Sequence, residues 1–550
     1  MRIALCQIDA TVGDLTGNAA RITDFAGRAQ AAGAELAVFP ELALCGYPPE
    51  DLLVRPGFLA AHDAALAELA RAVPAILPVL VGCVVRNELA ESRGGRPLHN
   101  GVALLHGGVA RIVATKTLLP TYDVFDESRY FEPNPAPERN VVAIAGRRIG
   151  VVVCEDGWND ERFFGKRIYA VDPVERVVAG GAEIVVNLSA SPWSVGKDAF
   201  RQRMVAAASA RHGVPMIYVN LVGGDVALQF DGGSLAVKPS GIAAQPVAFE
   251  EALAVVDTDA PWTLAPRLLP VEAMQRGALV QGIRSYVRKF GFQKAVIGLS
   301  GGIDSALVAA LAVDALGPTN VAGIGMPSRW SSDHSVVDAR ELAVNLGIAF
   351  HLLPIDGLQE AFDRALAPVF AGTPPGIAEE NLQSRIRGTL LMAFANKHGH
   401  LLLTTGNKSE CAVGYCTIYG DTNGALAPIA DLWKTEVWGL ARWLNRDGVR
   451  IPVRSVEKPP SAELRPGQLD TDSLPPYPVL DPVLRCLVEE DLSVAETAAR
   501  TGMPRERVAD LFAMVMAAEW KRNQYAPTLR VSERCWGGWR LPVAHRYRER

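Results

Sequence analysis

The chain has 550 residues, of which 49% are hydrophobic and 21% charged, a composition typical of a soluble globular protein. A single hydrophobic core does not grow to this size, so we expect at least two domains. A formal net charge of −5 gives no electrostatic reason to expect nucleic acid or an anionic membrane as a partner.

The targeting and redox features of the sequence favour a cytoplasmic protein. The opening MRIALCQIDA reaches Gln7 and Asp9 before an apolar run long enough for a signal peptide. The longest apolar run, residues 72–85, contains two prolines, so we interpret it as a buried strand rather than a membrane span. The eight cysteines form no C-x-x-C pair, which argues against a disulfide framework and against structural zinc.

From residue 1 to about residue 256, short β-rich runs alternate with helical patterns such as residues 18–34, which predicts an α/β domain. The expected strands are residues 2–8, 36–41, 79–85, 101–108, 148–154, 182–190, 215–224 and 234–238.

Three potentially reactive side chains lie at the ends of β-rich runs. Glu41 and Lys116 each follow such a run, and Cys154 lies at the end of another. A cysteine attacks an amide only as a thiolate, so it needs a base to take its proton and a positive charge nearby. Taken singly, each residue has an ordinary structural explanation: the cysteine as core, the glutamate as a helix cap, the lysine as surface. Together they are candidates for a nucleophilic site.

Residues 257–274 are punctuated by proline and show no sustained period, so we place the domain boundary there. We predict a first domain over residues 1–260, a linker over 261–274 and a second domain over 275–550.

The second half alternates strands and long helical patterns, which predicts a doubly wound parallel sheet. The proline-rich segment 457–478 has the composition of a loop, and a loop of this length in a compact domain is typical of a lid or of a disordered segment; we take it as a candidate lid. The expected strands are residues 295–300, 320–327, 350–355 and 400–406.

The segment GLSGGIDS, residues 298–305, lies between a strand and an apolar helix. The first amides of a helix are unpaired and lie at its positive end, so they bind anions. Gly301 and Gly302 let phosphate oxygens approach the backbone, and Ser300 and Ser305 add hydroxyl donors. The sequence has no G-x-x-x-x-G-K-[ST], so the phosphates are held differently from those of Walker NTPases.

SGGIDS resembles the loop of the ATP pyrophosphatase family, whose fold is adenine nucleotide alpha hydrolase-like. That loop alone does not distinguish among the members of the family, which include GMP synthetase, asparagine synthetase, argininosuccinate synthetase and tRNA thiolases. Four other segments favour one member of this family, because they resemble segments of NAD synthetases. They are ENLQSRIRGTLLMAFANK, LLLTTGNKSECAVGYCTIYGD, APIADLWKTEV and KPPSAELRPGQLDTDSLPPY.

This resemblance implies ATP as co-substrate, with Mg²⁺ held by Asp304 and Glu410. It implies contacts with deamido-NAD⁺ from Asn381, Glu410 and Lys521, and places Arg385 or Arg387 near its phosphates or carboxylate. The ATP-binding residues it implies are Gly298, Leu299, Ser300, Gly301, Gly302, Ile303, Asp304, Ser305 and Thr405.

In the first half, Glu41, Lys116 and Cys154 match in order and context the Glu-Lys-Cys triad of the nitrilase, or carbon-nitrogen hydrolase, family. NLSASPWSVGK and GGDVALQFDGGS resemble the glutaminase branch of that family. The resemblance implies an αββα sandwich, with Glu41 as proton acceptor, Lys116 stabilising the tetrahedral state and Cys154 forming a thioester. It further implies that three residues contact glutamine: Tyr122, Ser191 and Lys197. The other seven cysteines are interpreted as structural.

Over residues 2–525 the chain therefore resembles glutamine-dependent NAD⁺ synthetases. We expect it to hydrolyse glutamine, pass the ammonia internally and amidate an adenylated deamido-NAD⁺, as a homo-oligomer. The alternatives are another ATP pyrophosphatase amidotransferase, such as a GMP-synthetase-like enzyme, and a non-catalytic nucleotide sensor. The basic tail from Lys521 to Arg550 holds eight Lys or Arg against two Glu, and only Lys521 has a role here.

Overall fold

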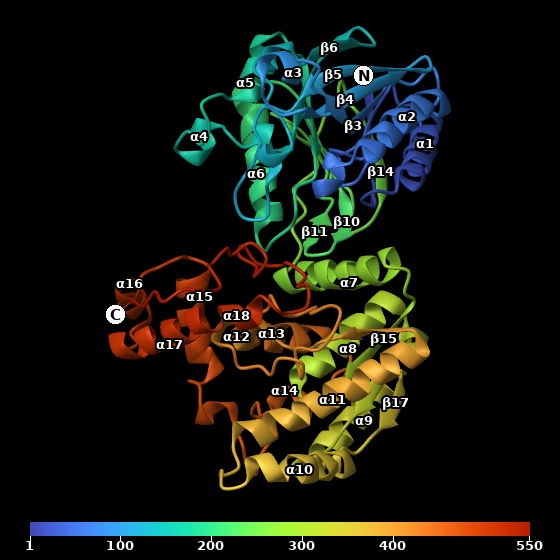
Figure 1. Cartoon of the computed structure of the whole chain (residues 1–550). Helices are drawn as coiled ribbons and strands as arrows, with labels where there is room; N and C mark the ends of the chain where they lie inside the picture. The colour runs from blue at the N-terminus through green and yellow to red at the C-terminus, as the bar shows by residue number, and fades with distance from the viewer. Residues whose placement is uncertain (550) are drawn as a thin grey trace. The chain divides into compact units, whose positions relative to one another are not determined.

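The computed structural model describes residues 1–549, and the chain divides into two compact units, Met1–Val271 and Glu272–Arg550 (Figure 1). Within the described residues, no helix has both the length and the apolar character needed to cross a membrane.

The first unit contains two six-stranded sheets and a short two-stranded one. In both larger sheets, parallel strands form the centre and antiparallel strands form the edges. The first sheet has the order β14 (Ala252–Asp257), β1 (Arg2–Gln7), β2 (Leu36–Val38), β3 (Val79–Arg86), β4 (Leu98–His106), β5 (Val109–Thr115). The second has the order β13 (Gly241–Ala244), β12 (Leu235–Lys238), β9 (Met216–Asn220), β8 (Ile184–Ser189), β7 (Arg147–Val153), β6 (Val141–Ile144). The small sheet pairs β10 (Val222–Asp225) with β11 (Leu228–Asp231).

The two larger sheets face each other across one apolar core, formed by residues such as Leu5 and Val38 from the first and Val153 and Val186 from the second. Helices α1 (Leu15–Ala31) and α2 (Pro56–Ala72) cover the outer face of the first sheet, through side chains such as Phe25. Helices α5 (Pro173–Ala179) and α6 (Lys197–His212) cover the outer face of the second. The unit is therefore an αββα sandwich, as predicted. Two single-turn helices complete it, α3 (Ala90–Arg93) and α4 (Glu161–Phe164).

Each predicted strand of this unit coincides with a strand of the structure. Five strands were missed: β5, β6, β11, β13 and β14. Only one residue of β5 is buried because it is an edge strand, so its sequence lacks the continuous apolar run of a buried strand. The others are four to six residues long; β6, β13 and β14 are only partly buried, whereas β11 is buried but alternates apolar with polar residues.

The second unit is built on a parallel sheet with the order β17 (Ala349–Leu352), β16 (Val321–Gly325), β15 (Lys294–Gly298), β18 (His400–Leu403). All four were predicted. Helix α8 (Ile303–Leu316) follows β15 and is apolar on nearly every side, and ten of its fourteen residues are buried. The other long helices are α7 (Val271–Lys289), α9 (Asp333–Leu346), α10 (Asp356–Phe370), α11 (Ile377–His398) and α13 (Lys434–Leu444).

A second apolar cluster of this unit joins α12 (Lys408–Val413) to the C-terminal helices, through residues such as Leu484 and Val515. These helices are α15 (Tyr477–Val488), α16 (Val494–Thr501), α17 (Arg505–Ala517) and α18 (Glu519–Arg522). The segment predicted as a lid runs from the end of α14 (Val453–Glu457) to the start of α15 and is irregular apart from one 3₁₀ turn, Asp470–Asp472.

Candidate active sites

A buried lysine lies between two carboxylates in the first unit. Lys116 follows β5, and its Nζ lies 2.7 Å from Glu41 Oε1 and 2.7 Å from Glu127 Oε1. Burial favours the neutral amine, but Glu127 and Glu41 raise the pKa of Lys116 well above its ordinary value. The lysine is therefore a permanent cation.

The carboxylate of Glu41 is fixed at both oxygens. Asn100 Nδ2 donates to Oε1 at 2.7 Å, beside the lysine, and the backbone N–H of Ala190 donates to Oε2 at 2.9 Å. Glu127 accepts from the Tyr47 hydroxyl at 2.9 Å. These contacts leave Glu41 little rotational freedom, as a general base requires.

Cys154 follows β7 and opens a 3₁₀ turn, Cys154–Gly157, with φ +45°. This left-handed conformation is costly for a residue with a side chain and is found where the surrounding structure enforces it. Burial and the carboxylate of Glu41 raise the pKa of the Cys154 thiol well above its ordinary value, while Lys116 opposes them. The raised pKa favours the protonated thiol, so nucleophilic attack by the sulfur would require a base to take its proton.

Asp156 joins the cysteine turn to the lysine segment. Its Oδ1 accepts from the backbone N–H groups of Thr117 (3.0 Å) and Leu118 (2.8 Å), and its Oδ2 accepts from Val153 N–H (3.1 Å). Burial raises the pKa of Asp156 to about 7 although these donors oppose it. The relative position of Lys116 and Cys154 is thus set by a buried side chain that contacts both segments.

Each of the three predicted glutamine-binding residues lies beside a residue close in sequence to Cys154 or beside one that contacts Glu41. The Tyr122 hydroxyl donates to Glu155, the residue after Cys154, at 3.1 Å. Lys197 Nζ lies 5.4 Å from the centre of the Trp158 ring. Ser191 is buried next to Ala190, and its N–H donates to Asn220 Oδ1 at 2.8 Å.

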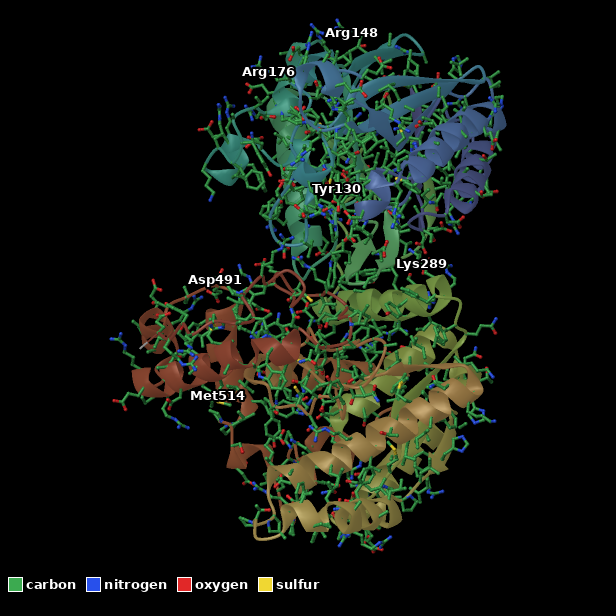
Figure 2. The ribbon with its side chains drawn as sticks, viewed as in Figure 1. Tyr130, Arg148, Arg176, Lys289, Asp491 and Met514 are labelled. Carbon is green, nitrogen blue, oxygen red and sulfur yellow. The ribbon has the colours of Figure 1, made fainter. Side chains whose placement is uncertain are left out.

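The segment that carries Glu127 is anchored at its far end. Tyr130, labelled in Figure 2, follows the 3₁₀ turn Glu127–Arg129 and donates its hydroxyl to Asp51 Oδ1 at 2.8 Å. Glu127 and Asn100 were not predicted from the sequence as site residues. The only signal was their position: Glu127 lies in the segment after Lys116, and Asn100 lies directly before the apolar run of residues 101–105.

In the second unit, the loop 298–305 joins β15 to the N-terminus of α8. Gly301 has φ +74°, and a Cβ there would lie 2.4 Å from the Ser335 carbonyl oxygen, so only glycine fits. The hydroxyls of Ser300 and Ser305 lie 3.2 Å apart, and Gly302 N–H donates to Ser300 Oγ. This is the geometry of an anion cradle at a helix N-terminus.

A second lysine lies between the two carboxylates predicted to hold metal. Lys434 Nζ forms ion pairs with Asp304 Oδ2 and with Glu410 Oε1, the latter at 3.2 Å. Asn407 Nδ2 donates to Asp304 Oδ1 at 3.0 Å. Burial raises the pKa of Glu410 to about 8, opposed by Lys434 and reinforced by Asp304. Lys434 and Asn407 were both missed as site residues, although both lie in segments that resemble NAD synthetases.

The cradle and these carboxylates line one cavity. Thr405 and Arg387 line it too, and Arg387 Nε donates to the Met326 carbonyl at 3.0 Å. The other cavity-lining residues include Tyr415, Cys416, Asp421, Lys458, Glu463, Leu464, Asp470 and Tyr525.

Asn381 and Lys521, both predicted to contact deamido-NAD⁺, lie against the segment after α12. Asn381 Oδ1 accepts from Thr417 Oγ1 at 2.8 Å, and Lys521 Nζ donates to the carbonyls of Gly414 (2.8 Å) and Cys416 (2.7 Å). Arg385 reaches the same segment, with Nε 3.3 Å from the Ile418 carbonyl oxygen.

The proline-rich segment 457–478 forms one wall of the cavity. Glu463 Oε1 accepts from Ser335 Oγ at 2.8 Å and from Ser332 Oγ at 3.0 Å, at the N-terminus of α9. Gln383 Nε2 donates to the Leu464 carbonyl at 2.8 Å. In this structure the segment is therefore held against the body of the unit.

A magnesium ion fits the Asp304–Glu410 pair. Mg²⁺ binds through one or two carboxylates and otherwise takes waters and substrate phosphates, so it does not need an all-protein cage. Across residues 1–549, no group of three or more His, Cys, Asp or Glu side chains is placed to hold a metal. Two carboxylates that face a phosphate cradle have the donor chemistry required.

Part of the basic tail has a structural role that the sequence analysis did not assign. Asp431 accepts from the backbone N–H groups of Val531 (2.8 Å) and Ser532 (2.7 Å), and the buried Lys408 donates to the Arg534 carbonyl at 2.7 Å. Arg534 also pairs with Asp491, labelled in Figure 2. The tail is thus anchored beside α12, although its last residue, Arg550, lies outside the described residues.

Two family models cover the two units. The carbon-nitrogen hydrolase family matches residues 2–266, and the NAD synthase family matches residues 276–525. The chain is 50% identical to the glutamine-dependent NAD(+) synthetase of Synechocystis sp., with 99% of each chain covered. It is 41% identical to that of Thermotoga maritima, covering 100% of this chain and 99% of the relative.

Solved structures show the same likeness. The structure of the glutamine-dependent NAD⁺ synthetase from Acinetobacter baumannii in complex with ADP is similar with a TM-score of 0.76 and 34% identity, over 98% of both chains. That from Cytophaga hutchinsonii shares the fold, with a TM-score of 0.84 at 24% identity, over 99% of this chain and 98% of the other.

Proposed function

This chain belongs to the family of glutamine-dependent NAD(+) synthetases, and we propose that each of its two units carries out one half of that reaction. It is a ligase that uses glutamine as nitrogen donor. What supports the proposal most directly is that one chain combines the buried Glu41–Lys116–Cys154 group with a glycine cradle facing Asp304 and Glu410.

The first unit releases ammonia from glutamine. Glu41 takes the proton of the Cys154 thiol as the sulfur attacks the amide carbon, and the ammonium of Lys116 stabilises the oxyanion. The proton passes to the departing nitrogen, so ammonia leaves and a γ-glutamyl thioester remains on Cys154. Water, deprotonated by Glu41, then cleaves the thioester and gives glutamate. Tyr122, Ser191 and Lys197 hold the substrate.

The second unit activates deamido-NAD⁺ with ATP. The loop 298–305, together with Thr405, holds ATP so that its β- and γ-phosphates lie on the N-terminus of α8. The nicotinate carboxylate attacks the α-phosphate and pyrophosphate leaves, after which ammonia attacks the adenylated carboxyl carbon and AMP leaves. Bound at Asp304 and Glu410, Mg²⁺ would neutralise charge on the leaving pyrophosphate.

Asn381, Glu410 and Lys521 contact deamido-NAD⁺ in this proposal, and the segment 457–478 acts as the lid. The lid is supported by its contacts from Glu463 and Leu464 to the rim of the cavity. Keeping water out matters because an acyl adenylate is hydrolysed easily.

We propose further that ammonia passes between the sites without entering bulk water. Free ammonia is mostly ammonium at neutral pH, and ammonium has no lone pair for attack. With amide-¹⁵N glutamine and excess unlabelled ammonium, the NAD⁺ formed should stay largely ¹⁵N-labelled, and full dilution of the label would show release to solvent. A cytoplasmic location and a homo-oligomeric assembly stay predictions.

An assay with two nitrogen sources, glutamine and ammonium salt, tests whether each unit carries out one half of the reaction. Cys154→Ala should lower glutamine-dependent NAD⁺ synthesis by on the order of 10³-fold or more, yet leave synthesis from ammonium salt largely intact. Asp304→Ala should abolish synthesis from both sources while leaving glutamine hydrolysis measurable. Loss of both activities in Cys154→Ala, with the fold intact, would contradict the proposal.

The same assay separates the alternatives. Synthesis from xanthosine monophosphate instead of deamido-NAD⁺ would indicate a GMP-synthetase-like enzyme, which neither the family matches nor the relatives favour. Binding of ATP without turnover of any acceptor would indicate a nucleotide sensor.

A further inference from the structure

The first turn of α12 holds both carboxylates that face the phosphate cradle of the second unit. Asn407, the N-cap of this helix, donates to Asp304 Oδ1 at 3.0 Å. Glu410 lies in the same turn and pairs with Lys434 at 3.2 Å. Because α12 has only six residues, its own hydrogen bonds give it little stability. The position of both carboxylates therefore depends on what holds this helix in place.

Lys408, the first residue of α12, holds the helix through a buried network of charges. Its side chain is 0% exposed, and its Nζ lies 2.9 Å from Asp431 Oδ1 and 2.6 Å from Glu489 Oε1. Asp431 precedes Lys434 by three residues, and Glu489 is the C-cap of α15. One ammonium group thus joins the helix that carries Glu410 to the segment that leads to Lys434.

The C-terminal tail completes this network. Ser532 Oγ accepts from Lys408 Nζ at 2.6 Å and donates to Asp431 Oδ1 at 2.8 Å. The Arg534 carbonyl also accepts from Lys408 Nζ, at 2.7 Å. These tail residues lie beyond the range 276–525 that the NAD synthase family matches. A segment outside the family match therefore contacts the helix that carries the two carboxylates.

The chemistry of the network favours a role in geometry over a role in stability. Burying charged groups costs more than packing an apolar side chain of similar volume, so a buried ion pair is weak evidence for stability. Its contacts are directional, however, because each charge-assisted hydrogen bond fixes the ammonium of Lys408 relative to one oxygen atom. An arrangement of this kind fixes where α12 begins.

We propose that Lys408 and the tail segment 531–534 position the ATP site, by holding α12 so that Asp304 and Glu410 present their oxygens to Mg²⁺. This inference rests on the proposed function, in which ATP and Mg²⁺ bind at these carboxylates. Neither Lys408 nor Ser532 is among the described residues that line the cavity. Both are positioning residues, which act through α12 and its N-cap.

The test measures equilibrium binding of ATP to the full chain without an acceptor, once with Mg²⁺ and once with EDTA. With Mg²⁺, Lys408→Met should bind ATP roughly 10- to 100-fold more weakly than wild type, as expected when partners that orient metal ligands are lost. Ser532→Ala should bind it roughly 3- to 10-fold more weakly, the effect of one lost hydrogen bond. With EDTA, both variants should match wild type within about twofold, because the cradle of residues 298–305 is unchanged.

Two controls separate positioning from folding. Ser532→Thr keeps the hydroxyl and should bind ATP with Mg²⁺ as wild type does. Ser493→Ala removes the N-cap hydroxyl of α16, which accepts from the Glu496 N–H at 3.2 Å. It should lower the unfolding temperature and leave ATP binding unchanged under both conditions. Glutamine hydrolysis should match wild type in all these variants.

The outcomes separate the inference from the proposed function. Wild-type protein that binds ATP equally well with Mg²⁺ and with EDTA would overturn the metal role of Asp304 and Glu410. If Mg²⁺ strengthens ATP binding as much in Lys408→Met and Ser532→Ala as in wild type, the positioning role is wrong. An equal weakening with Mg²⁺ and with EDTA would overturn it too. If Lys408→Met does not fold, Ser532→Ala decides the question.

Discussion

Both units place a lysine between two carboxylates, but only one of the two groups is sealed from solvent. In the first, the side chains of Lys116 and Glu41 are 0% exposed and that of Glu127 is 5% exposed. In the second, Lys434 is 2% exposed while Asp304 and Glu410 are 19% and 18% exposed. Of these two groups with the same charge pattern, one therefore lies in the protein interior and the other at the edge of a cavity.

The difference in exposure suits different chemistry. A sealed group is complete in itself, because every charge is compensated by protein and the geometry is fixed before substrate arrives. An open group can exchange partners, because its carboxylate oxygens can turn from the lysine to a metal ion or follow a bound phosphate. We infer that the first group acts as a rigid base and electrostatic support, and the second as a site that is completed by its ligands.

Removing each lysine should have the largest effect and tests this contrast directly. Lys116→Met leaves Glu41 and Glu127 buried without a cation, so we expect glutamine hydrolysis to be lost and the free energy of unfolding to fall by about 3–5 kcal/mol. Lys434→Met should destabilise less, because Asp304 and Glu410 reach solvent. Thermal unfolding of the full chain, with residual activity from each nitrogen source, measures both. Equal destabilisation would contradict the contrast.

Much of this arrangement could be predicted from sequence because it is local. The apolar runs before Cys154 and at the start of the loop 298–305 predict strands. Reactive side chains that follow a strand therefore lie where that strand ends. The partners are not local. Lys434 and Asp304 are 130 residues apart, and only the fold brings them together. Roles of individual residues came from family resemblance, not from periodicity.

The domain boundary shows the same limit. Helix α7 begins at Val271, inside the segment predicted as a linker. That segment was assigned as a linker because residues 257–274 contain several prolines and show no sustained period. The compact units divide at Val271 and Glu272. Proline-rich sequence locates a break in the fold, but contacts decide where a helix starts.

Gly301→Ala should have the next largest effect, confined to the second unit. The new Cβ would meet the Ser335 carbonyl at 2.4 Å, so the cradle must shift, and synthesis from either nitrogen source should fall by on the order of 10²-fold. Glutamine hydrolysis should persist. Gly347→Ala is the matched control, since it also has positive φ, +68°, but its nearest neighbour is Pro318 Cβ at 3.8 Å. It should cost about 1–2 kcal/mol of stability and little activity. Equal activity losses would show that backbone strain, not the cradle, matters.

The smallest effect concerns pH and the sealed group. Burial raises the pKa of Glu127 to about 7, although Lys116 opposes it. Between about pH 4.5 and 7 the folded protein therefore holds a proton that the unfolded chain has lost, and the free energy of unfolding falls as pH rises. The slope from this one group is at most about 1.4 kcal/mol per pH unit.

Glu127→Gln should remove that contribution, because glutamine keeps the acceptor for Lys116 and Tyr47 but does not titrate. Glu183→Gln, an exposed carboxylate of the same unit that pairs with Arg147 at 3.5 Å, should leave the slope unchanged. Denaturant unfolding of the full chain from pH 4.5 to 8, with loss of glutamine hydrolysis as the readout, measures it. If Glu127→Gln had the wild-type slope, Glu127 would be ionised in the folded state. Attraction to Lys116 would then outweigh burial, and the sealed group would hold two carboxylates and one lysine with a net negative charge beside Cys154.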